Sequence, residues 1–184
     1  MTAPEPRWLS DDEQATWRSV IAVLNLLPAQ LERVLQQRHG LSLHDYEILV
    51  RLSETPDRRM RLSELAGLSQ QSKSRLSHQM TRMEHAGLVR RESCPTDRRG
   101  SFAVMTDEGY ARLVAAAPDH VESVRAHLFD KIPADLVPAL GEALRGVAAH
   151  LIGADAGATC PAVPVNPGTG RPAPSREPNA SPAS

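Results

Sequence analysis

The chain has 184 residues, of which 41% are hydrophobic and 23% charged, which is enough for one domain with a core. Only 3% of the residues are aromatic, so base stacking on single-stranded nucleic acid is not expected. The N-terminus lacks the apolar run of a signal peptide, and no stretch reaches the roughly 20 apolar residues of a membrane span, so we expect a cytoplasmic protein.

The net charge of -1 hides an uneven distribution along the chain. Residues 58–100 contain ten Lys and Arg against four Asp and Glu, a local net charge of +6, so the remainder carries -7. A basic segment inside an acidic frame is typical of a phosphate-binding surface, although charge runs are more often just solvated faces.

Composition predicts three segments. Residues 1–9 form a flexible N-terminus, and residues 10–152 form the folded domain. Residues 153–184 hold seven of the fifteen prolines with many Ala, Gly and Ser residues, so this tail is expected to be disordered.

Long amphipathic helices are predicted at both ends of the folded domain. The first covers residues 11–38, with a bend expected at Pro28. Its apolar residues recur at spacings of three and four: Trp17, Val20, Leu24, Leu27, Leu31 and Val34. Two further helices with the same spacing cover residues 106–128, with a bend at Pro118, and 137–151. One small domain cannot bury the apolar faces of all three helices. These helices therefore predict a homodimer interface.

The middle of the chain predicts a helix from Ser42 to before Pro56, a strand at 60–62 and a short helix at 63–68. A turn, a helix over 70–85 and two strands at 88–93 and 101–105 follow. The strands are joined by CPTDRRG, whose Pro, Asp and Gly favour a turn. This order predicts a mainly α fold, a winged helix-turn-helix with a β-hairpin wing.

The helix over 70–85 is the expected major-groove reader. Leu76, Met80 and Met83 fall on its inward side. Its other faces carry six candidate DNA contacts: Gln71, Lys73, Ser74, Arg75, His78 and Arg82. Arg and Gln can bind base edges, whereas Ser and Lys reach phosphates. The alternative is an ordinary solvated helix face.

The hairpin tip supplies a second candidate contact. Asp97, Arg98 and Arg99 lie on an expected turn, where an arginine can enter the negative potential of a minor groove. Asp97 is interpreted as the partner that orients an arginine side chain. A solvated polar turn is the alternative.

No metal, cofactor or catalytic site is predicted. The histidine pairs His78–His85 and His120–His127 are seven residues apart, which is not the i, i+4 spacing of a helical zinc motif. No nucleophile–base or nucleotide-binding motif is present, so enzyme activity is not expected. Cys94 has four arginines near it in sequence, which favours a reactive thiol, but an incidental small residue is the preferred interpretation.

The sequence resembles the MarR family of bacterial regulators. The runs that carry the resemblance are LSLHDYEILVRLSE, RLSELAGLSQQSKSRLSHQMTRMEHAGLVRRE and CPTDRRGSFAVMTDEGYARL. Its most specific parts are Asp97-x-Arg99-Gly100 and Thr106-x-x-Gly109. The resemblance covers about residues 11–152, whereas Pro28 and the proline-rich tail lie outside the family pattern.

The resemblance implies a dimer formed by the terminal helices and a winged domain that reads an inverted repeat of double-stranded DNA. It places Lys73, Ser74, Arg75, His78 and Arg82 in the major groove, and Arg99 with Asp97 in the minor groove. It further implies repression released by a small, aromatic effector. Two other hypotheses stay open: a winged-helix protein-interaction module, and a thiol redox-sensing regulator that acts through Cys94.

Overall fold

The computed structural model describes residues 5–69, 71–94 and 97–154. Its longest helix, α1 (Asp11–His39), begins with a capping box in which the Ser10 side chain accepts from Glu13 N–H and the Glu13 carboxylate accepts from Ser10 N–H. Gly40, with φ of 64°, ends it. The sequence predicts a bend at Pro28, but the helix continues through this residue as one element.

Helix α2 (Leu43–Ser53) starts with a second capping box, formed by Ser42 and Asp45. A single 3-10 turn, η1 (Pro56–Arg58), then leads into strand β1 (Arg59–Arg61). The sequence predicts the helix and the strand but not the turn between them, which depends on positive φ angles at two non-glycine residues, Asp57 and Arg58.

Helices α3 (Leu62–Leu68) and α4 (Lys73–His85) form the helix-turn-helix. The predicted start of the second helix at residue 70 is wrong by three residues. The Ser72 side chain accepts from Arg75 N–H and caps α4, so Gln71 belongs to the turn and not to the helix. Serine is a strong N-cap residue, which is the physical reason for the later start.

Strands β2 (Val89–Cys94) and β3 (Asp97–Met105) complete an antiparallel sheet of order β1-β3-β2. The predicted start of the last strand at residue 101 is wrong, because β3 begins four residues earlier. Ser93 pairs with Ser101 but Cys94 pairs with Asp97, so residues 98–100 form a bulge between consecutive pairs. The bulge consists of Arg98, Arg99 and Gly100, the same residues that indicate a turn in the sequence.

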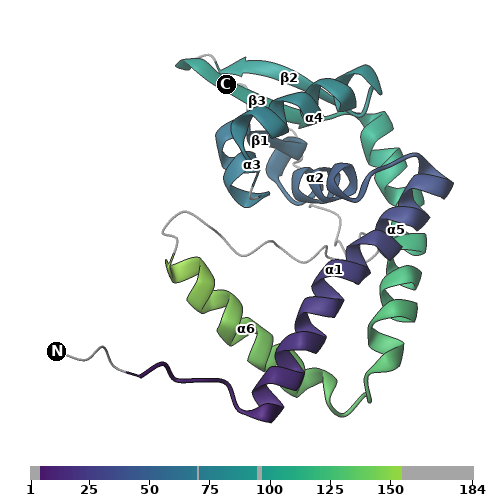
Figure 1. The fold of residues 1–184 in the computed structure, drawn as a ribbon. Coiled ribbons are helices and arrows are strands. Elements are labelled where there is room, and N and C mark those ends of the chain that lie inside the picture. Colours follow the sequence, from purple (N-terminus) through teal and green to yellow (C-terminus); the bar gives the residue numbers. More distant parts are fainter. Residues whose placement is uncertain (1–4, 70, 95–96, 155–184) are drawn as a thin grey trace, which may run out of the picture.

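The described part of the chain ends with three elements: α5 (Asp107–His127), the 3-10 turn η2 (Phe129–Lys131) and α6 (Val137–Ala154). In Figure 1, α1 and α5 lie side by side and extend away from a lobe made of α2, α3, α4 and the sheet.

The mainly helical fold with a small sheet confirms the predicted fold class. Within the described ranges, no helix is both long and apolar enough to cross a membrane. The predicted disordered tail lies outside the described residues, apart from Gly153 and Ala154 at the end of α6.

The core lies in this lobe, which we call the winged lobe, and at its junction with α5. Its fully buried side chains come from every helix of the lobe and from α5, and include Ile48, Leu49, Leu65, Met80 and Leu113. At about 25 cal/mol for each Å² of apolar surface removed from water, such side chains supply most of the driving force for folding. One core therefore joins the winged lobe to the end of α1 and the first half of α5.

Thr106 and Gly109 fix α5 against the wing. The Thr106 hydroxyl accepts from Gly109 N–H at 2.9 Å and donates to the Gly87 carbonyl oxygen at 2.6 Å. A Cβ atom at Gly109 would collide with the Leu88 carbonyl oxygen and lie 3.0 Å from Met105 Cγ. The Thr106-x-x-Gly109 motif is thus explained by a close approach of the first turn of α5 to the start of the wing.

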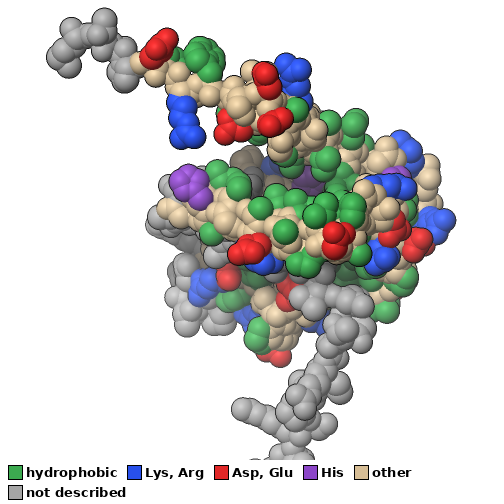
Figure 2. Space-filling model, turned by 90° about the horizontal axis from the view of Figure 1, so that it is seen from below, with side chains coloured by type: hydrophobic (Ala, Val, Ile, Leu, Met, Phe, Trp, Pro, Cys, Tyr) green, Lys and Arg blue, Asp and Glu red, His purple; other side chains and the backbone are tan. Residues whose placement is uncertain are grey.

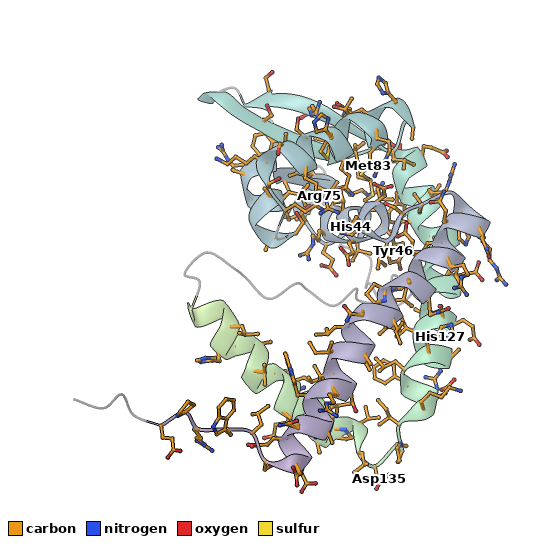
Figure 3. All side chains as sticks on the ribbon, viewed as in Figure 1. His44, Tyr46, Arg75, Met83, His127 and Asp135 are labelled. Atoms are coloured by element: carbon orange, nitrogen blue, oxygen red, sulfur yellow. The ribbon has the colours of Figure 1, made fainter. Side chains whose placement is uncertain are left out.

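Tyr46 and His120 join α2 to α5. Their rings lie 4.4 Å apart between centroids, and Figure 3 shows Tyr46 where the winged lobe meets the long helices. Burial raises the pKa of Tyr46 to about 12 and lowers the pKa of His120, so both side chains are neutral at pH 7. This contact therefore places two uncharged rings at the junction between the two parts.

We predict that Gly109→Ala lowers the free energy of unfolding by about 2–3 kcal/mol, because the added methyl group forces α5 away from the Leu88 backbone. Urea unfolding at one fixed protein concentration measures this change. The matched control is Ala111→Ser, which adds one atom at an exposed position of the same helix and should have a much smaller effect. Equal stability of the Gly109→Ala variant and the parent would contradict the proposed packing.

Candidate nucleic-acid interface

Helix α4 has one buried and one exposed side. Leu76, Met80 and Met83 are 3%, 0% and 1% exposed, which confirms their predicted inward orientation. Five of the six candidate contacts on this segment are exposed: Lys73, Ser74, Arg75, His78 and Arg82. Figure 3 shows Arg75 and Met83 in the winged lobe. The helix therefore presents cations, hydroxyls and an imidazole to solvent.

The helical period orders these side chains around α4. At 100° for each residue, Ser74, His78 and His85 lie within about 40° of one another on the outermost ridge. Arg75 and Arg82 lie on one flank of that ridge. A helix that enters a groove with this ridge foremost would bring both the ridge and its arginine flank to the DNA.

Gln71 differs from the other candidates. It lies in the turn before α4 and is only partly exposed, and its Oε1 atom is buried without a hydrogen bond among the described residues. Its predicted role as a base reader stays a prediction.

A buried carboxylate holds α4 on this arginine flank. Asp45, only 7% exposed, lies on α2, and its Oδ1 accepts hydrogen bonds from Gln79 Nε2 at 3.0 Å and from an Arg82 guanidinium nitrogen at 2.8 Å. The Arg82 side chain nevertheless remains 63% exposed. Arg82 can therefore reach solvent or DNA from a position that Asp45 restricts.

Sequence reasoning did not find this arrangement. The sequence indicates Arg82 only as a groove contact. A signal was present in Gln79, a polar residue at an inward position of α4, because a buried amide needs a partner. The partner itself could not be identified, since it lies 34 residues away in the chain.

Arg91 of β2 holds the opposite flank of α4. Its guanidinium donates to the Ser77 carbonyl oxygen at 2.8 Å and lies 2.9 Å from a Glu84 carboxylate oxygen. The Arg91 backbone N–H donates to the other Glu84 oxygen at 2.8 Å. With Asp45 on one side and Arg91 on the other, α4 is fixed to both α2 and the wing.

The wing candidates are only partly described. Cys94 ends β2 and Asp97, Arg98 and Arg99 begin β3, but their side chains lie outside the described part of the structure. The predicted pairing of Asp97 with an arginine, the minor-groove role of Arg99 and the redox hypothesis for Cys94 all stay predictions.

Strand β1 adds a row of arginines that sequence reasoning counted only as charge. The Arg59 and Arg61 guanidinium groups lie 3.9 Å and 5.1 Å from the centre of the Phe102 ring, and that of Arg58 lies 3.8 Å from the centre of the Tyr110 ring. Cation–π contacts at these distances orient the arginines. Among the described residues, no group of three or more His, Cys, Asp or Glu side chains is placed to bind a metal ion.

A helix-turn-helix followed by a β-hairpin, with a polar and cationic helix face left exposed, defines a winged helix-turn-helix protein. The MarR family profile matches residues 41–101. AbsC, a MarR family transcriptional regulator from Streptomyces coelicolor, is 53% identical, with a TM-score of 0.74 over 80% of this chain and 99% of AbsC. The chain belongs to the MarR family of transcriptional regulators.

Two other proteins are similar over different lengths. Sco3205, a MarR family regulator from Streptomyces coelicolor solved in complex with DNA, is 47% identical, with a TM-score of 0.74 over 79% of this chain and 91% of Sco3205. The transcriptional regulator HosA from Escherichia coli O111:H- is 47% identical over 47 residues. That match spans 26% of this chain and 35% of HosA, so it covers only a part of the regulator.

We predict that Asp45→Ala lowers the free energy of unfolding by about 2–3 kcal/mol, because it leaves the Gln79 amide unpaired in the core and removes a helix cap. Urea unfolding measures this change in the free energy of unfolding. In the control Asp107→Ala, the carboxylate is fully exposed and its ion pair with Arg58 is at the surface, so the loss should be much smaller. Equal losses in the two variants would show that Asp45 does not hold α4.

Proposed function

We propose that this MarR family chain acts as a homodimeric, sequence-specific DNA-binding regulator that reads an inverted repeat of double-stranded DNA. The exposed face of α4 carries the proposal, because it is polar, cationic and fixed on both flanks. Sco3205, which was solved in complex with DNA, is 47% identical to this chain, and this similarity supports the proposal. Two copies would place their α4 helices in successive major grooves, about 34 Å apart.

Exposed apolar side chains support the dimer. On α1, Trp17, Leu24 and Leu26 are 54%, 62% and 64% exposed in the single chain. On α6, Leu144, Val147 and Leu151 are 55%, 57% and 61% exposed. Figure 2 shows hydrophobic side chains gathered on the face seen from the end opposite the winged lobe. Apolar surface of this extent on a soluble chain indicates an interface, and a second copy of the chain is the occupant that we propose.

Regulation by a small molecule is part of the same proposal. A small aromatic effector that binds between the long helices and the winged lobes would change the spacing of the two α4 helices. Both half-sites could then no longer be matched together, and the protein would leave its operator as a released repressor. A coupling free energy of about 1–3 kcal/mol is typical of such effects.

The experiment that tests DNA binding is a titration against the DNA that flanks the protein's own gene. It is performed at two salt concentrations with excess random competitor. Tight, competitor-resistant and salt-sensitive binding is expected, because phosphate contacts release counterions. If neither this DNA nor any member of a random duplex library binds, the DNA-binding proposal fails and the winged lobe is a protein-interaction module.

We predict that Arg75→Ala reduces the preference for operator over random duplex by about 1–3 kcal/mol, because it removes a side chain that can hold a base edge. The ratio of the two dissociation constants measures this. Lys131→Ala is the matched control, since it removes the same charge from η2, at the end of α5 away from the winged lobe. An equal loss on both duplexes would instead make Arg75 a phosphate contact.

We predict that Leu24→Asp weakens self-association by about 100-fold, because the dimer would have to bury a carboxylate at an apolar seam. Light scattering coupled to size-exclusion chromatography measures the shift from dimer to monomer. Gln37→Glu is the control, since it adds the same charge at an exposed position near the end of α1. A Leu24→Asp variant that remains fully dimeric would exclude this part of α1 from the interface.

A further inference from the structure

A pocket of about 360 Å³ opens between α3, α4 and the wing, at Gly100 and Ser101 of β3. Two cationic side chains from different elements line it: Arg61, the last residue of β1, and Lys73, the first residue of α4. Among the described residues that line the pocket, none is Asp or Glu. The pocket is thus suited to an anion.

Hydrogen-bond donors surround these cations. The hydroxyl-bearing residues Ser63 of α3, Ser77 of α4 and Ser101 of β3 also line the pocket, and Gly100 brings bare backbone to it. Hydroxyl groups beside Lys and Arg are the usual ligands of phosphate oxygens in protein–DNA complexes. The lining combines cations with hydroxyl groups. It therefore suits a phosphate better than a carboxylate, which a single cation would hold.

Cross-strand packing restricts Arg61. It pairs with Phe102 across β1 and β3, and its guanidinium lies 5.1 Å from the centre of the Phe102 ring. A guanidinium held against an aromatic face loses less side-chain entropy when it binds a ligand. Lys73, the first residue of α4, is positioned by the start of that helix, which Ser72 caps.

The place of the pocket in the fold indicates which phosphate it meets. If α4 lies in the major groove and the wing in the adjacent minor groove, one sugar–phosphate backbone must pass between them, because that backbone is the ridge that separates the two grooves. The pocket lies between α4 and the wing, and hence at this ridge.

We propose that this pocket binds a phosphate of the DNA backbone, with Arg61 and Lys73 neutralising its charge. The proposal rests on the DNA-binding function proposed above. It adds Arg61, a residue of β1 outside both the helix-turn-helix and the wing tip, to the DNA contacts. The contact sets the register of α4 in the groove and carries no base preference itself.

The test measures the salt dependence of binding for the full-length dimer with Arg61→Gln. The slope of log K against log salt concentration should fall by about 0.9 for each protomer, and operator and random duplexes should weaken by the same factor, about tenfold. Arg61→Lys, which keeps the charge, should retain the slope. Arg58→Gln is the control, because the Arg58 guanidinium lies over Tyr110 and beside Asp107, outside the pocket lining.

The outcomes separate the two proposals. If the parent protein binds no duplex, DNA binding itself is wrong. If the parent binds with a steep salt slope that Arg61→Gln leaves unchanged, only the pocket proposal is wrong. A second variant, Ser63→Glu, places a carboxylate in the pocket and should weaken both duplexes, and normal binding by it would also overturn the proposal.

A free anion is the competing ligand for the same chemistry. Inorganic phosphate is therefore added to the parent protein–DNA complex at constant ionic strength, with chloride as the reference. We expect phosphate to release no more DNA than chloride does, because a diester fixed in the duplex is the ligand. If inorganic phosphate binds the free protein through Arg61 while the Arg61→Gln variant keeps the DNA affinity and salt slope of the parent, the pocket is a site for free anions and the assignment to the backbone is overturned.

Discussion

Helix α4 must keep one side in the core while the other side remains in water, and much of the winged lobe serves this requirement. The apolar stripe of Leu76, Met80 and Met83 sets which side is buried. It sets the rotation of the helix about its axis only coarsely, because the hydrophobic effect is non-directional. Asp45 and Arg91 supply directional contacts from α2 and β2 on opposite flanks, so the exposed ridge has one orientation.

The long helices reach α4 through few contacts. Thr106 and Gly109 bind the start of α5 to the residues that follow α4, and the Tyr46–His120 contact joins the middle of α5 to α2. In the dimer proposed above, a displacement of the long helices would be transmitted to α2 and the wing, because α5 continues from these points as one helix. Helix α2 in turn carries Asp45, which binds α4.

The sequence predicts the elements of this fold far better than their contacts. Apolar periodicity and capping residues determine the helices, and these signals are local, so α1, α2 and α5 are found almost to the residue. The starts of α4 and β3 are missed because Ser72 competes with earlier residues as a cap, and because Arg98, Arg99 and Gly100 suit a bulge as well as a turn. The Asp45–Arg82 pair joins residues 37 positions apart, a separation that no local pattern reports.

The pairing of charges separates the arginines that hold the scaffold from those on the exposed face. Glu84 and Glu92, two of the four acids in the basic segment, are paired with Arg91 and Arg90 of β2. Within the described part of the chain, Lys73 and Arg75 of α4 have no ion pair. The unpaired positive charge of α4 therefore lies at the start of this helix, and its effect falls off within about 10 Å at ordinary salt concentration. A net charge of -1 for the whole chain is compatible with phosphate binding, because DNA at this surface meets the local charge and not the total.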